Sequence, residues 1–201
     1  GKGWVLGETL ITGIGQGYTQ TTPIQLCLMT AQIANGGYKI TPKILTEDNQ
    51  LTSEQIKKAM QDSKLKNYYK PLYDDQRNIK IVQETMFSST NELRGTSYKS
   101  RIDDPKYQFA GKTGTAQVKR ISKRERELDL KTSQIPYEER DHALYVAFGP
   151  YKNPRYALSI LVEHGGNGST TAAPMAKKLF KLIIDRHSLR ESINDKKYMD
   201  I

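Results

Sequence analysis

The residues best suited to chemistry form one short run at 111–117, Gly-Lys-Thr-Gly-Thr-Ala-Gln. A substrate carboxylate near Thr113 and Thr115 would gain two hydroxyl donors, while Lys112 would supply positive charge. Gly114 has no side chain, so a ligand can lie directly against the backbone there. The N–H of Thr115 could stabilise a developing oxyanion. These residue types favour acyl transfer on a substrate with a free carboxylate, although an ordinary strand with a glycine bulge has the same pattern.

The run needs a strand to position it, and the segment 107–118 has the pattern of a strand interrupted by glycine. Alternation along a strand places Lys112 and Gly114 on one face and Thr113 and Thr115 on the other. The substrate-binding groups would therefore surround the backbone of a single strand.

Two nucleotide-binding motifs are excluded by spacing. Gly-Lys-Thr also ends a phosphate-binding loop, but that motif needs a glycine five positions before Gly111, where Lys106 stands, and a helix afterwards. The glycine-rich segment 13–17 lacks the spacing of a dinucleotide fingerprint, and we interpret it as a tight turn.

Other patterns define the surrounding elements. Thr22-Pro23 caps a helix that ends at the Asn-Gly-Gly sequence of 35–37. Apolar spacing predicts further helices around 54–60, 79–86 and 170–187. Strands are predicted at 143–148 and 156–162, joined by a turn at 149–154. The predicted inward-facing residues of the three longer helices are Ile24, Cys27, Leu28, Ala31, Ile33; Ile79, Val82, Met86; and Met175, Leu179, Leu182, Ile183. The sum is an α+β fold with helices first, then three antiparallel strands, then a covering C-terminal helix.

Composition narrows the class of protein. The chain has 201 residues, 31 Lys and Arg against 22 Asp and Glu, and a net charge of +9. The charges are mixed in sign along the chain and lack interleaved aromatic residues, so we expect no nucleic-acid partner. Attraction to an anionic membrane surface or cell-wall polymer stays open. No apolar run is long enough to span a membrane, and no signal peptide is visible.

Metal and cofactor sites are not predicted. His142, His164, His187 and Cys27 are scattered and lack ligand spacing. A single cysteine excludes an internal disulfide, and no motif requires a cofactor. We expect His142 to be structural or to lie at the entry of a strand.

The sequence 112–117 resembles the Lys-Thr-Gly motif of penicillin-binding proteins. Flanking segments strengthen the resemblance to the class B enzymes, and in particular to their elongation-type members. The matching segments are Gly-Ile-Gly-Gln-Gly-Tyr at 13–18, Thr-Pro-Ile-Gln at 22–25, Ala-Asn-Gly-Gly at 34–37, Arg-Asp-His-Ala at 140–143 continuing to 147–150, and Glu-His-Gly-Gly at 163–166 with the helix that contains Pro174. The resemblance implies that 1–187 is the C-terminal part of a transpeptidase domain of the serine β-lactamase/transpeptidase-like fold. A charged insertion occupies 119–140, either as an exposed loop or as a lid or partner-docking element, and a polar, frayed tail occupies 188–201.

This family cross-links peptidoglycan stem peptides that end in D-Ala-D-Ala and is acylated by β-lactams. By resemblance, Lys112 supplies charge, Thr113, Gly114 and Thr115 bind the substrate carboxylate, and the Thr115 N–H completes the oxyanion hole. The parent protein would face the periplasm from an inner-membrane anchor outside this chain. Its partners would be a membrane glycosyltransferase and the cell-shape complex.

The family also needs Ser-x-x-Lys for the nucleophile and Ser-x-Asn for proton relay. Ser63 with Lys66 and Ser89 with Asn91 match these patterns, but both follow the 13–17 segment, whereas the family's motifs precede it. We interpret both as chance matches and expect this chain alone to be inactive. The alternative is a non-catalytic interaction or sensor module in which the Lys-Thr-Gly residues only bind.

An incomplete transpeptidase sheet would leave an unpaired strand edge and exposed apolar surface. We therefore expect the isolated chain to be marginally stable or to self-associate.

Overall fold

The computed structural model describes residues 3–42, 71–119, 127–128 and 130–199. Its elements follow one another as α1 (Leu6–Gly13), α2 (Pro23–Ala34), α4 (Gln76–Asn91), η1 (Tyr98–Ser100), β1 (Ala110–Ala116), η2 (Thr132–Gln134), η3 (Tyr137–Glu139), β2 (His142–Gly149), β3 (Tyr156–Val162) and α6 (Ala172–Met199). The α+β order predicted from the sequence is confirmed. The predicted helix at 54–60 and the Ser63 motif lie outside the described residues.

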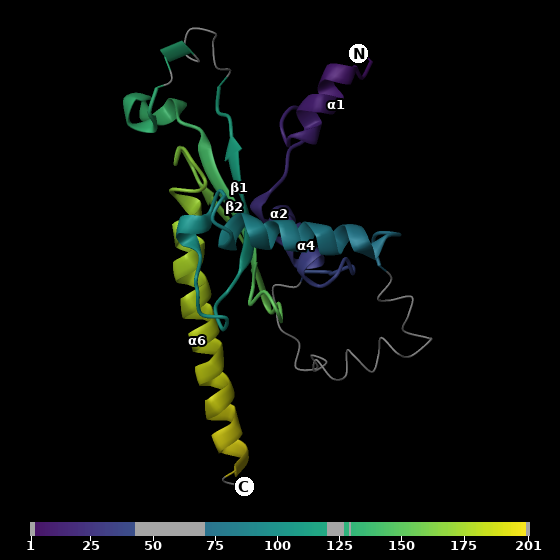
Figure 1. Ribbon diagram of the computed structural model, residues 1–201, viewed down its shortest axis with the longest axis vertical. Coiled ribbons are helices and arrows are strands. Elements are labelled where there is room, and N and C mark those ends of the chain that lie inside the picture. Colours follow the sequence, from purple (N-terminus) through teal and green to yellow (C-terminus); the bar gives the residue numbers. More distant parts are fainter. Residues whose placement is uncertain (1–2, 43–70, 120–126, 129, 200–201) are drawn as a thin grey trace.

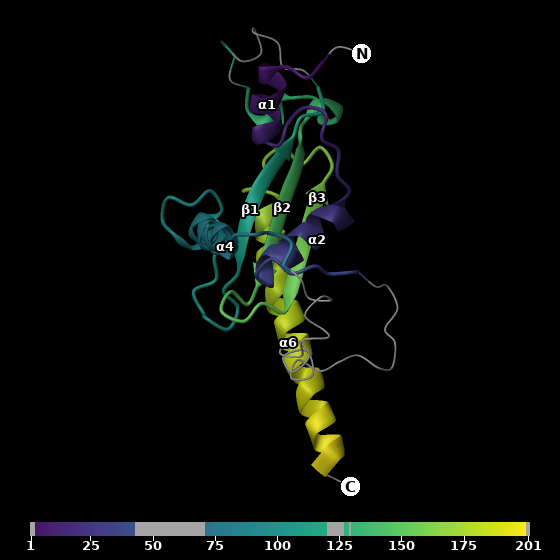
Figure 2. The ribbon, with the colours of Figure 1, turned by 90° about the vertical axis from the view of Figure 1, so that its right-hand side faces the viewer.

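The three strands form one antiparallel sheet in the order β1-β2-β3. The register pairs Thr113 of β1 with Tyr145 of β2, and Tyr145 with Ile160 of β3. Figure 2 shows α6 behind the sheet, α2 in front of it near β3, and α4 beside β1. Strand β1, which carries the Lys-Thr-Gly run, therefore lies between β2 and the end of α4.

Helix α6 covers one face of the sheet with small and aromatic side chains. Phe180 is fully buried and stacks on Phe109 at 4.8 Å between ring centroids. Its neighbours in this core include Ala172, Ala173 and Ala176, which allow the helix to lie close to β2. The predicted inward face was wrong in part, since Met175, Leu179 and Leu182 are 41–61% exposed. The alanines set the contact face because larger side chains would hold the helix away from the sheet.

The end of α6 also differs from the prediction. The helix continues past His187 to Met199, so the expectation of a frayed tail was wrong. Residues 188–199 contain neither proline nor glycine, and nothing in that sequence stops a helix already formed. Figure 1 shows this part of α6 running well beyond the sheet.

Helix α2 begins at the cap that the sequence predicts. The Thr22 hydroxyl accepts a hydrogen bond from the Gln25 N–H, and the Gln25 side chain accepts one from the Thr22 N–H. Helices α2 and α4 are joined by Gln83 of α4, whose side chain donates to the carbonyl of Ile33 at 2.6 Å. Ile79 and Met86 are buried as predicted. Ile24 and Val82 are exposed, a second correction of the predicted helix faces.

Helix α1 was not predicted. It has no buried residue, and Figure 1 shows it apart from the sheet. The tight turn expected after it is confirmed, because Gly15 and Gly17 have φ angles of 76° and 89°. No helix among the described residues is both long and apolar enough to cross a membrane.

The expected open edge is present. Within the described part of the chain, β3 pairs only with β2, and its other edge has no strand partner. Leu161 on β3 is 40% exposed and lies on the sheet face opposite α6, since Leu158, Ile160 and Val162 pack toward the α6 core. Self-association through the open edge stays a prediction.

Candidate active site

Strand β1 presents its charged and hydroxyl side chains to solvent. Lys112 and Thr115 are exposed, and Thr113 is half-buried. The Lys112 ammonium folds back along the strand and donates to the Thr113 carbonyl at 2.9 Å and to the Thr113 Oγ1 at 3.4 Å. The structure thus places an ammonium and a hydroxyl in contact at the centre of the strand.

Along β1, the backbone N–H and C=O groups of every second residue point away from β2. The carbonyl of Gly111 accepts from Thr90 of α4, and the carbonyl of Thr113 accepts from Lys112. Both carbonyls therefore point to the outer edge. In a strand the N–H and C=O of one residue point to the same side, and residues two apart repeat that direction. The N–H of Thr115 consequently faces the same outer edge.

A buried phenol on β2, that of Tyr145, holds β1 in place at Gly111. Tyr145 of β2 is fully buried and crosses Gly111 to reach α4. Its hydroxyl lies 2.9 Å from Thr90 Oγ1 and 3.1 Å from Ser97 Oγ. Burial raises the pKa of Tyr145, against the opposing effect of these two hydrogen bonds, so the phenol stays protonated. A methyl group on Gly111 would lie 2.5 Å from Tyr145 Cζ and closer still to the hydroxyl, and only glycine fits there.

A tight turn after α4 brings a second hydroxyl segment to β1. Gly95 packs against the last carbonyls of α4, where a Cβ would lie 2.6 Å from the Ser88 oxygen. The Ser97 N–H and hydroxyl both donate to the Ser89 carbonyl, at 3.1 and 3.0 Å. Thr96, between these two fixed residues, is held at the edge of β1.

Three hydroxyls connect this turn to the ammonium. Ser89 Oγ lies 3.2 Å from Thr96 Oγ1, and Thr96 Oγ1 lies 3.4 Å from Thr113 Oγ1. We call Ser89, Thr96 and Thr113 the hydroxyl row. Sequence reasoning missed Thr96, Thr90, Ser97 and Tyr145; the signals were the concentration of hydroxyl residues at 88–98 and a tyrosine within an apolar strand.

The backbone at Gly114 is open on one side only. Apart from its two neighbours in the chain and Leu144 Cβ at 3.3 Å, no described atom lies within 4 Å of the point where a Gly114 side chain would begin. The loop at Gly168 lies close to the strand, since a Cβ there would be 2.6 Å from the Gly114 carbonyl oxygen. The side with space is therefore the one available to a ligand.

The Ser-x-Asn match at 89–91 is split by the fold. Asn91 donates to the carbonyls of Phe87 and Phe109, both at 3.0 Å, and so joins α4 to the start of β1. Ser89 instead begins the hydroxyl row. The two side chains serve different contacts.

His142 and His164 lie at the same end of the sheet as Thr115, because His142 pairs with Ala116, and they make structural contacts. His142 Nδ1 accepts from the His164 N–H at 2.9 Å, and the two rings lie 4.9 Å apart. No group of three or more His, Cys, Asp or Glu side chains suitable for a metal occurs among the residues that the structure describes.

Part of the 119–140 insertion touches the domain. Lys119 pairs with Glu139 at 2.6 Å. Thr132 lies against Gly166, where a Cβ would come 2.6 Å from Thr132 Cγ2. Residues 127–128 and most of 130–139 are exposed. Whether the insertion acts as a lid stays a prediction.

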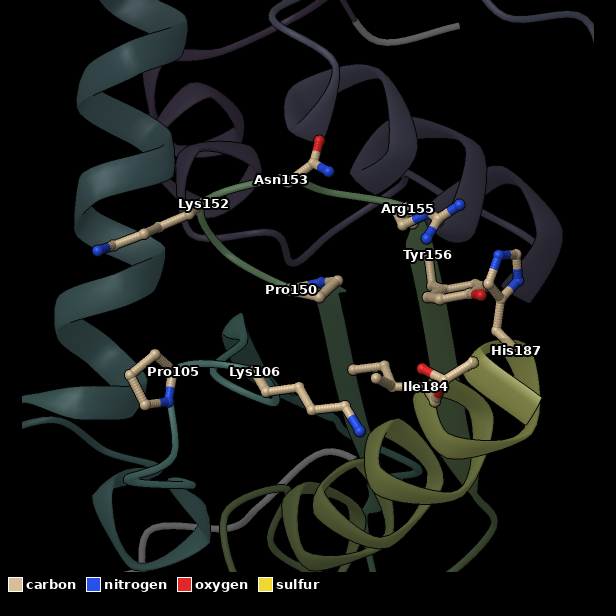
Figure 3. A pocket seen from close by; sticks show the side chains of 10 residues that line it. Pro105, Lys106, Pro150, Lys152, Asn153, Arg155, Tyr156, Ile184 and His187 are labelled. Atoms are coloured by element: carbon tan, nitrogen blue, oxygen red, sulfur yellow. Dashed lines mark hydrogen bonds between the residues drawn. The ribbon is translucent and has the colours of Figure 1, made fainter. Parts of the chain in front are cut away.

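A cavity of about 340 Å³ lies at the other end of the sheet, beside the β2–β3 turn (Figure 3). Lys106, Lys152 and Arg155 are among its lining residues, together with Ile184 and His187 from α6. Lys106 already pairs with Asp185 at 3.1 Å. None of the Lys-Thr-Gly residues lines this cavity.

Comparison with known proteins gives one consistent result. The penicillin binding protein transpeptidase domain family matches residues 1–181. The peptidoglycan D,D-transpeptidase MrdA of Haemophilus influenzae is 33% identical over 189 residues, which cover 91% of this chain and 27% of that protein.

Two solved structures share the fold. Pseudomonas aeruginosa PBP2 in complex with WCK 5153 matches with a TM-score of 0.61 and 37% identity over 88% of this chain and 32% of that chain. The complex between PBP2 and MreC from Helicobacter pylori matches with a TM-score of 0.61 and 32% identity over 90% and 29%.

The chain spans about a quarter of the length of the MrdA protein it matches. The family match, in contrast, extends over nine tenths of the chain and includes α1, α2, α4, the three strands of the sheet and the start of α6. The fold and the sequence therefore agree: the chain belongs to the penicillin-binding protein transpeptidase domain family and forms a C-terminal portion of such a domain.

Proposed function

We propose that the full-length protein containing this chain is a PBP2-type peptidoglycan D,D-transpeptidase. The observation that carries the proposal is the outer edge of β1. There the Lys112 ammonium, the Thr113 hydroxyl and the outward N–H of Thr115 lie along one open strand, in a chain that belongs to the family. Cations and hydroxyl donors along an open strand suit a ligand with a terminal carboxylate.

The proposed roles are as follows. Thr113 and Thr115 donate to the carboxylate of a stem peptide ending in D-Ala-D-Ala or of a β-lactam, and Lys112 balances its charge. Gly114 admits the ligand to the backbone, and the Thr115 N–H donates to the oxyanion that forms during acylation. The nucleophilic serine comes from a part of the protein outside this chain.

The setting of the activity is also proposed. The protein works at the periplasmic face of the bacterial inner membrane, with a membrane glycosyltransferase and the cell-shape complex as partners. The Helicobacter pylori PBP2 structure, which contains MreC, supports a partner of that kind.

The test is the acylation rate of the full-length protein by a fluorescent penicillin. Replacing Lys112 with Ala should lower the second-order rate of acylation, measured well below saturation, by about 10- to 100-fold, because a hydrogen bond to a charged group is worth about 1.5–3 kcal/mol. Lys99→Ala is the matched control, since Lys99 is an exposed lysine on η1. It should leave the rate unchanged.

Mapping of the labelled serine separates the enzyme from a non-catalytic module. We expect the label on a serine outside this chain, and no adduct on the chain alone. A label on Ser63 would show that its Ser-x-x-Lys match is functional. Full-length protein that takes up no penicillin would favour the interaction or sensor module.

A further inference from the structure

The hydroxyl row ends at the residue proposed to bind the substrate carboxylate, and the proton positions along it can be worked out. Lys112 is an ammonium that only donates, so Thr113 Oγ1 accepts from it at 3.4 Å. A hydroxyl has one proton and two lone pairs. Thr113 can therefore accept from a second donor and still donate its own proton to a ligand.

Thr96 is placed to be that second donor, at 3.4 Å from Thr113 Oγ1. When Thr96 donates to Thr113, its own oxygen is free to accept from Ser89, 3.2 Å away. All three protons then point the same way, from Ser89 through Thr96 to Thr113 and out toward the ligand. In the reverse order Thr113 would donate its proton to Thr96, and that proton would not be available for a hydrogen bond to a ligand carboxylate.

The surrounding structure holds the Thr96 backbone in place, while the contacts of its hydroxyl are those with Ser89 and Thr113. Gly95 and Ser97 on either side are held against the end of α4 by close packing and by the Ser89 carbonyl. Thr96 itself is exposed, so its hydroxyl contributes little to the core. A residue with a fixed backbone and an exposed hydroxyl next to a ligand-binding oxygen is suited to positioning.

We propose that Thr96 is a positioning residue, which directs the Thr113 proton toward the terminal carboxylate of the ligand and so sets the preference for carboxylate over uncharged ends. The inference rests on the proposed function. It predicts an effect on binding before acylation, because the carboxylate keeps its charge throughout the reaction and is bound equally in ground and transition states.

The experiment measures acylation of the full-length protein by a penicillin and by the corresponding penicillin methyl ester, with the dissociation constant and the acylation rate constant determined separately. Thr96→Val removes the hydroxyl and keeps the shape. We expect its dissociation constant for the penicillin to rise about five- to tenfold, because about one hydrogen bond is weakened. The acylation rate constant and the weak binding of the ester should stay within about twofold of wild type.

Three further variants make the test specific. Thr96→Ser keeps the hydroxyl and should behave as wild type. Ser89→Ala removes the next donor and should show a smaller rise in the same constant. Ser88→Ala is the matched control: its hydroxyl donates to Glu92 at 2.8 Å, outside the row, and it should have no effect.

The outcomes are distinct. Thr96→Val with wild-type binding of the penicillin overturns the inference and leaves the proposed function intact. Equal losses for penicillin and ester, or a lowered melting temperature, assign Thr96 a merely structural role and also overturn it. Wild-type protein that is not acylated at all overturns the proposed function, and the inference with it.

Discussion

Gly111 is a position in the candidate site at which a single methyl group should be strongly destabilising. An alanine Cβ there would lie 2.5 Å from Cζ and 2.8 Å from Cε1 of Tyr145, well inside van der Waals contact. Tyr145 cannot move aside, because it is fully buried and held at its hydroxyl by Thr90 and Ser97. Either the ring leaves these partners or β1 separates from β2.

The size of the effect follows from these contacts. Overpacking a buried site costs about 1–3 kcal/mol, and loss of the two hydrogen bonds adds about 1 kcal/mol each. We expect Gly111→Ala to lower the free energy of unfolding by about 3 kcal/mol. Tyr145→Phe, which removes only the hydroxyl, should cost about 1 kcal/mol, since Thr90 can still donate to Met86 and Ser97 to Ser89.

The assay is urea unfolding of the full-length protein, followed by fluorescence and circular dichroism. Gly7→Ala is the matched control, because Gly7 lies in α1 and a Cβ there would meet no described atom within 4 Å outside its chain neighbours and the helix backbone. It should be neutral or slightly stabilising. If Gly111→Ala unfolds like wild type, or costs less than Tyr145→Phe, the packing of Tyr145 over Gly111 is not as described.

Two other predictions concern single contacts. Thr22→Ala removes the cap of α2 and should cost about 1 kcal/mol in the same unfolding assay, while Thr22→Ser should restore it. The Tyr107 hydroxyl and the Lys106 ammonium lower the pKa of the Asp185 carboxyl, so this group adds stability above its unfolded pKa and loses it as the pH falls through the folded value. In Asp185→Asn the urea midpoint should therefore decrease less as the pH falls below about pH 4. If it decreases as steeply as in wild type, the pairing of Asp185 with Tyr107 and Lys106 is contradicted.

Local signals predicted the elements that carry the site. Thr22-Pro23 marks the start of α2, and the glycines after Asn35 mark its end. The alternation at 143–148 and 156–162 gave β2 and β3 nearly at their observed bounds. These features depend on neighbours in sequence, which is why a pattern is sufficient to find them.

Features that depend on distant contacts were less predictable. Met175 and Leu182 belong to an apolar spacing as good as that of Phe180 and Ile184, and only the sheet decides which face of α6 is covered. The role of Thr96 is similar. It depends on a turn that brings residue 96 next to residue 113, and no local pattern encodes that approach.

The placement of Gly111 also has a consequence for how the site can change during evolution. Sliding β1 by one residue against β2 would bring either Lys112 or Ala110 under the phenol of Tyr145, where no side chain fits, and would turn every chemical group to the wrong face. The anchor that prevents this consists of Gly111, Tyr145, Thr90 and Ser97, none of which is proposed to touch the ligand. Mutation can thus exchange the outward side chains of the strand, and alter what the protein binds, without losing the alignment on which any binding depends.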